Sequence, residues 1–131
     1  MASELRVNTL KDAAGNNSVG MSTVANGSAK AWVNFNGTGT LAVRDSFSIS
    51  SVTDGGTGDF PINFSASFAN ANYSAIASGS EDASGTGTLK DRTVIPRTLA
   101  TNSLEIYNYS GPSSGQADFA LNFSSYFGDL A

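Results

Sequence analysis

The sequence contains no cysteine and no histidine. Without cysteine, the chain cannot form disulfide bonds, thiolate nucleophiles or zinc sites with sulfur ligands. Without histidine, it cannot form a Ser-His-Asp triad or offer the nitrogen ligands that zinc prefers. We therefore expect no catalytic residues, no cofactor and no metal centre of these kinds.

Charge is also scarce, because charged residues make up only 14% of the 131 residues. The seven basic residues are dispersed, and only Lys90 and Arg92 are near neighbours, with Asp91 between them. Binding to nucleic acid or to an anionic membrane needs a concentrated basic face, so we expect neither partner.

The first residues lack the basic and apolar regions of a signal peptide, and no apolar run is as long as a membrane span. We expect a protein that is made in a cytoplasm and does not insert into a membrane.

Polar surface must instead come from Ser, Thr, Asn and Gly, which suit strands and tight turns better than helices. Apolar and polar residues alternate with the two-residue period of strands, and no stretch shows a helical period. Residues 11–17 are predicted to form a turn, residues 18–28 a connector and residues 54–59 a hairpin turn. Predicted strands cover residues 4–10, 29–36, 41–52 (with a bulge at 50–51), 60–64, 73–79, 89–96, 104–109 and 117–123. This pattern predicts an all-β fold, an antiparallel β-sandwich of Greek-key or jelly-roll-like type, with an extended N-terminal strand segment.

Most aromatic residues are predicted to lie in the core, because they fall in strand phase with apolar neighbours. These residues are Trp32, Phe35, Phe47, Phe60, Phe64, Phe68, Phe119 and Phe123. Tyr107 and Tyr109 share the other face of their strand with Glu105, opposite Leu104, Ile106 and Asn108. Exposed tyrosines are typical of surfaces that recognise sugars or proteins, although a subunit interface would give the same pattern.

Acidic residues are the remaining candidates for catalysis, since glycosidases use a pair of carboxylates. Asp54 and Asp59 flank a glycine-rich turn, and Glu81 and Asp82 belong to a predicted loop over residues 80–88. We interpret all four as solvated turn residues, because turns select Asp for local hydrogen bonds. A structural calcium ion at residues 54–59 is left open, although the segment lacks the ligand pattern of an EF-hand.

Two parts of the sequence resemble tail-fibre-like virion proteins of marine and cyanobacterial bacteriophages. Residues 5–15 (LRVNTLKDAAG) resemble the short N-terminal segment of those proteins. Residues 29–38 (AKAWVNFNGT), with 44–47 (RDSF) and 54–60 (DGGTGDF), resemble their C-terminal module. The two matches cover about the first half of the chain, and the related fibres often have a long shaft between them.

The resemblance implies a non-enzymatic homotrimer exposed on the virion. Residues 1–28 would be an attachment and oligomerisation segment, and residues 29–131 a β-sandwich domain that faces the host. We expect Leu5, Val7 and Leu10 to be buried against other virion proteins or against each other. Tyr107, Tyr109, Glu81 and Asp82 are the candidate receptor-facing residues, for a glycan or protein of the host cell surface. The alternatives are a head decoration or tail adaptor protein with a purely structural role and, less favoured, a polysaccharide depolymerase tip.

Overall fold

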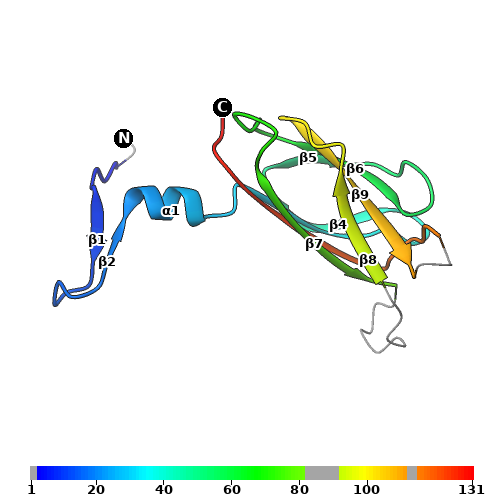
Figure 1. The fold of residues 1–131 in the computed structure, drawn as a ribbon, viewed down its shortest axis with the longest axis horizontal. Coiled ribbons are helices and arrows are strands. Elements are labelled where there is room, and N and C mark those ends of the chain that lie inside the picture. Colours follow the sequence, from blue (N-terminus) through cyan, green and yellow to red (C-terminus); the bar gives the residue numbers. More distant parts are fainter. Residues whose placement is uncertain (1–2, 82–91, 112–114) are drawn as a thin grey trace.

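The computed structural model describes residues 3–81, 92–111 and 115–131. Over these residues, a two-stranded hairpin and a short helix are followed by two four-stranded sheets that pack face to face (Figure 1). The N-terminal elements are β1 (Thr9–Lys11), β2 (Ser18–Gly20) and α1 (Met21–Gly27). The sandwich contains β3 (Ala31–Asn36), β4 (Ala42–Phe47), β5 (Ile49–Val52), β6 (Asp59–Phe64), β7 (Ser74–Ser80), β8 (Arg92–Arg97), β9 (Ser103–Ser110) and β10 (Leu121–Phe127).

The two sheets have the strand orders β4-β3-β10-β7 and β5-β6-β9-β8, and the paired neighbours run antiparallel. The chain crosses between the sheets after β4, β6, β7 and β9. Strands that follow each other in sequence therefore often lie in different sheets, as they do in Greek-key sandwiches. The predicted all-β antiparallel sandwich is confirmed.

The core lies between the sheets and follows the two-residue period of the strands. Its inward-facing residues on β3, β6 and β9 are Ala31, Val33, Phe35, Phe60, Ile62, Phe64, Leu104, Ile106 and Asn108. At one end, the ring of Phe64 packs edge-on against other rings, with centroids 5.0 Å from Phe68, 5.0 Å from Tyr126 and 5.7 Å from Tyr73. Five of the eight aromatic residues predicted to be core are buried, namely Phe35, Phe60, Phe64, Phe68 and Phe119.

The other three aromatic residues predicted to be core were placed wrongly. Trp32 is half-buried, Phe47 is 53% exposed and Phe123 is 40% exposed. Trp32 and Phe35 are an odd number of residues apart, so they cannot share one face of a strand. Because β3 buries Phe35, Trp32 points outward, and Phe47 lies opposite it on the neighbouring strand.

The alternation predicted over residues 117–123 breaks before β10 begins. Phe119 and Ala120 are both buried, and β10 then turns Asn122, Ser124 and Tyr126 inward. Asn122 Nδ2 donates a hydrogen bond of 2.8 Å to the carbonyl oxygen of Phe119, which holds this irregular entry to the strand. Asn122 and Ser124 of β10 therefore lie inside, and the prediction that Phe123 lies inside is wrong.

The segment over residues 41–52 is two strands rather than the single predicted strand. The break falls at Ser48, whose φ of 55° lies in the left-handed region. This turn sends β4 into one sheet and β5 into the other. The bulge predicted at residues 50–51 is confirmed, because the β5–β6 register shifts between Ile49 and Ser51.

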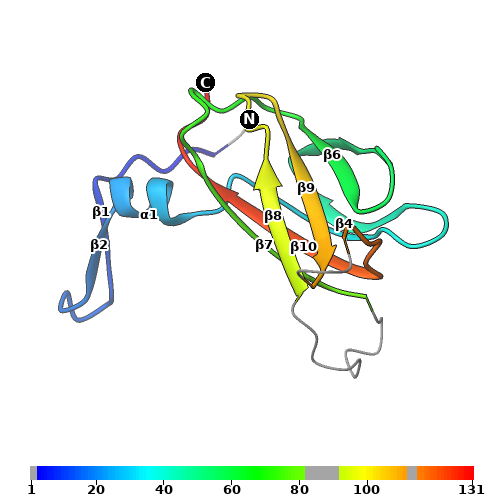
Figure 2. The same ribbon diagram turned by 45° about the vertical axis from the view of Figure 1, so that its right-hand side comes forward.

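The N-terminal part differs most from the prediction. Of the predicted strand over residues 4–10, only Thr9 and Leu10 are paired, and their partner is β2 of the same chain. The turn predicted over residues 11–17 is confirmed, with Asp12 accepting hydrogen bonds from the backbone N–H groups of Asn16 and Asn17. Residues 18–28, predicted to be a connector, contain α1, which is too short to show a helical period. We call residues 3–28 the arm, and in both views it projects from one end of the sandwich (Figure 1, Figure 2).

Two glycines with similar backbone angles allow the packing around the β5–β6 turn to be tested. The φ of Gly39 is 62° and that of Gly58 is 67°. A Cβ on Gly39 would meet open space. A Cβ on Gly58 would lie 2.7 Å from the carbonyl oxygen of Asn108 and 2.8 Å from the backbone nitrogen of Ala117.

We expect G39A to lower the free energy of unfolding by about 1–2 kcal/mol through backbone strain alone. We expect G58A to lower it by roughly 1–3 kcal/mol more, because the backbone must also shift. Urea unfolding of both variants measures the difference, and equal losses would contradict this packing.

Candidate functional site

The arm exposes the three residues predicted to mediate attachment. Leu5 is 80% exposed, and Val7 and Leu10 are also exposed. Glu4 and Arg6 beside them form an ion pair, with 2.9 Å between Arg6 Nε and Glu4 Oε1, on a solvent-facing surface where such pairs stabilise little. The apolar side chains of the arm are therefore available to a partner.

Helix α1 supports the same interpretation. It has seven residues, no side-chain hydrogen bond at its N-cap, no acidic residue in its first turn, no basic residue in its last turn and no buried residue. Helices this short are unstable in water unless they pack against something. Met21, Val24 and Ala25 have the i, i+3, i+4 spacing of one helix face. This face provides apolar surface for a partner that would stabilise the helix.

The predicted tyrosine face is the outer surface of the sheet β5-β6-β9-β8. Tyr107 pairs with Asp59 on β6 and with Ile95 on β8, so it lies in the middle of this surface. Its hydroxyl donates a hydrogen bond of 3.2 Å to Asp59 Oδ2. The guanidinium of Arg97 lies over the ring, 4.5 Å from the centroid, as in cation–π pairs. Tyr107 is thus held on both sides by charged neighbours.

The surroundings of Tyr107 also change the pKa of its hydroxyl. Loss of solvent around the phenol raises the pKa of Tyr107 above its ordinary value. The negative charge of Asp59 and the hydrogen bond that Asp59 accepts raise this pKa further. Glu105 adds to the increase, and Arg97 opposes it. The hydroxyl therefore stays protonated at neutral pH and can donate a hydrogen bond.

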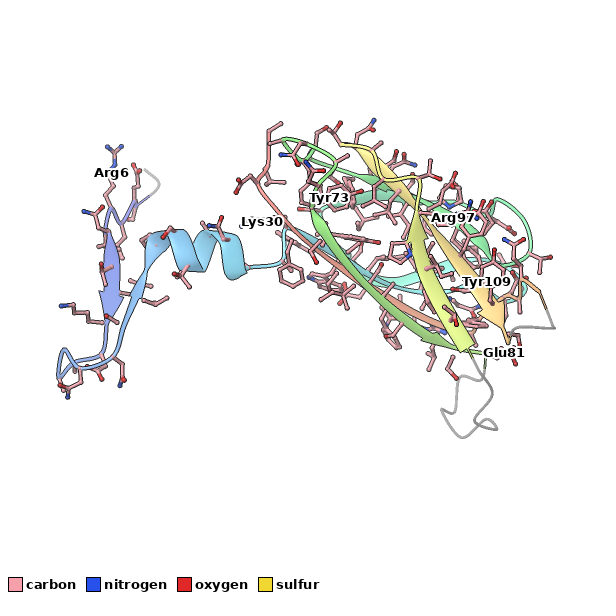
Figure 3. The ribbon with its side chains drawn as sticks, in the orientation of Figure 1. Arg6, Lys30, Tyr73, Glu81, Arg97 and Tyr109 are labelled. Atoms are coloured by element: carbon pink, nitrogen blue, oxygen red, sulfur yellow. The ribbon has the colours of Figure 1, made fainter. Side chains whose placement is uncertain are left out.

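The other candidate receptor-facing residues lie at one end of the sandwich. Tyr109 is two residues beyond Tyr107 on the same face, and its backbone bridges to Gln116. Figure 3 shows Tyr109 and Glu81 toward the end of the sandwich that lies away from Lys30 and the arm. Asp82 lies outside the described residues. The structure therefore brings Tyr107 and Tyr109 together and places Glu81 toward the same end, directly after the last residue of β7.

Asp54 and Asp118 both accept hydrogen bonds from the backbone of the glycine-rich turn over residues 54–59. Asp54 Oδ1 accepts a hydrogen bond of 2.9 Å from the backbone N–H of Gly56, as expected for a turn aspartate. Asp118 Oδ1 accepts one of 2.7 Å from the N–H of Gly58. Across the part of the chain that the structure describes, no three acidic side chains gather into a group that could hold a metal ion. The calcium alternative at residues 54–59 therefore gains no support from geometry.

Prediction from sequence missed a second surface, the outer side of the sheet β4-β3-β10-β7. We define the aromatic face as the outward side chains of Trp32, Phe47, Ile76, Phe123 and Phe127. The odd spacing of Trp32 and Phe35 was the available signal that one of these rings faces outward. No such signal marks Phe123, because the register of β10 depends on contacts made far away in sequence.

The fold and these surfaces define a small antiparallel β-sandwich with an N-terminal hairpin–helix arm. The sequence matches no protein-family model, no curated protein and no solved structure. Among the described residues, no helix is long and apolar enough to cross a membrane.

The contact between Tyr107 and Asp59 gives a titration that can be measured. In D59N we expect the pKa of Tyr107 to fall, because the negative charge that disfavours the phenolate is gone. The pKa should remain above its ordinary value, since loss of solvent is the largest cause of the shift. NMR titration of labelled tyrosine rings measures this change. D54N is the control, and a Tyr107 pKa that is the same in D59N and the wild type would rule out the contact.

Proposed function

We propose that this protein is a non-enzymatic bacteriophage virion protein, a tail-fibre or appendage module that is attached by its arm and recognises the host surface through its sandwich. The resemblance of residues 5–15, 29–38, 44–47 and 54–60 to tail-fibre-like proteins supports the virion role. The observation that carries the proposal is the separation of two surfaces. The apolar arm projects from one end of the sandwich, and Tyr109 and Glu81 lie toward the other end.

This arrangement suits a protein that binds in two directions. The arm would dock on the particle through Leu5, Val7 and Leu10, and three copies would associate around an axis. The tyrosine face, with Arg97, Glu105 and Asp59, would contact a glycan or protein of the host. Tyrosine and arginine suit such contacts, because they combine apolar area with hydrogen-bond donors. Several weak sites on one particle would bind by avidity.

The attachment role predicts the effect of changing the arm alone. In L5S/L10S the exposed apolar side chains are removed, and we expect particles assembled with this variant to carry far fewer copies, a loss of about tenfold or more. Quantitative mass spectrometry of purified particles measures the copy number. L99S is the control, because Leu99 on the sandwich is about as exposed as Leu10. Normal incorporation of L5S/L10S would disprove attachment through these residues.

The recognition role predicts an effect on cells but not on assembly. In Y107A/Y109A we expect normal copy number on the particle and adsorption to susceptible cells reduced by about tenfold or more, since avidity multiplies a loss at each site. N63A, on a neighbouring strand of the same sheet, is the control. Unchanged adsorption at normal copy number would favour the alternative of a head decoration or tail adaptor protein that binds no receptor.

A further inference from the structure

The aromatic face crosses the whole sheet β4-β3-β10-β7. Trp32 pairs with Phe47 on one side and with Ser125 on the other, and Ser125 pairs with Ile76. Residues paired across antiparallel strands point to the same side of the sheet. A row of outward side chains therefore runs from edge strand to edge strand, with a single serine in it.

Further rings extend this row along β10. Phe123 and Phe127 lie two residues on either side of Ser125, so they point to the same side of the sheet. Ile76 is 62% exposed, and Phe47 and Phe123 are also exposed. Soluble monomers rarely show a large contiguous apolar patch without a partner for it. This surface is thus the kind that another molecule covers.

The charges of the face indicate what that molecule is. The strand pairing shows which positions of the four strands point outward, and Asp45 is the one charged residue among them. Arg44, next to Asp45 in the sequence, reaches across the same side of the sheet. Arg44 donates to Asn34 Oδ1 at 3.4 Å and to the carbonyl oxygen of Ala120 at 2.7 Å. One acidic and one basic residue make the face close to neutral, although the chain has a net charge of −4. A second copy can therefore approach here without like-charge repulsion, and its Arg44 can meet Asp45.

The face is also continuous with the arm. Trp32 is two residues after Lys30, whose backbone N–H donates a hydrogen bond of 2.8 Å to the carbonyl oxygen of Tyr126. The ammonium of Lys30 donates to the carbonyl oxygen of Ala25 in α1, so it links the helix to the start of β3. Figure 3 shows Lys30 at this junction. A contact between copies that is centred on Trp32 lies next to the arm, where the uncovered side of α1 can also be buried.

We propose that the aromatic face is the surface through which copies of this chain bind each other. The occupant of each face is the aromatic face of another copy, with Trp32, Phe47 and Phe123 at the centre of the contact and the arms packing next to it. This inference does not depend on the virion role, because it rests on the apolar area, the balanced charge and the junction with the arm.

The single tryptophan of the chain reports on this face directly. Trp32 emission from the full-length protein is recorded over a dilution series, together with the molar mass from light scattering. We expect a mass above the monomer value of 13.4 kDa at high concentration. As dilution lowers the mass, the emission should shift to the red and acrylamide quenching should increase. A monomer at all concentrations, or dissociation without any change in Trp32 emission, would overturn the proposal.

A pair of variants separates this face from the rest of the surface. F47K/F123K places charge on two exposed positions of the aromatic face, and I95K does so at an exposed position of the opposite sheet. We expect the first variant to be monomeric, with an unchanged circular dichroism spectrum, and I95K to keep the mass of the wild type. A folded F47K/F123K with the mass of the wild type would show that another surface holds the copies together. Dissociation of I95K would refute the proposal as well, because it would place the contact on the tyrosine face.

Discussion

One hydrogen bond in the core determines how the last strand is oriented. Asn108 Nδ2 on β9 donates to Asn122 Oδ1 on β10 at 2.6 Å, and so joins the two sheets across the sandwich. Both residues are fully buried, and Asn122 also donates to the carbonyl oxygen of Phe119. Leaving such a group without a partner costs about 1–3 kcal/mol, so Asn122 stays inside. The two-residue period of the strand then forces Phe123 outward.

Because Phe123 faces outward, the outer faces of the two sheets differ in chemistry. One sheet presents rings and small polar side chains with nearly balanced charge. The other presents Tyr107 between Asp59 and Arg97, with Glu105 close by. We propose that the first face holds copies together and that the second meets the host. A protein that needs both tasks can divide them between two sheets, because each strand has only one side in the core.

The same arrangement explains how the arm can be stabilised. A seven-residue helix with no side-chain hydrogen bond at its N-cap, no acidic residue in its first turn and no basic residue in its last turn has little stability of its own. The hairpin before it is a two-stranded unit, which is also marginal in water. Both elements keep apolar side chains exposed, and both join the sandwich at the edge of the aromatic face. Packing between copies at this junction would supply the stability that the arm lacks.

The sequence alone determined the fold class and the inner faces of β6 and β9, because strict alternation and Asp-Gly turns act locally. It also placed Tyr107 and Tyr109 on the face opposite Leu104, Ile106 and Asn108, since that follows from strand period alone. Tertiary structure decided the division of residues 41–52 between two sheets, which depends on the left-handed backbone of Ser48. It decided the outward position of Phe123, which depends on the contact of Asn122 with a residue of another strand. These features could not be derived from local pattern, because the interactions that select them form only when the two sheets meet.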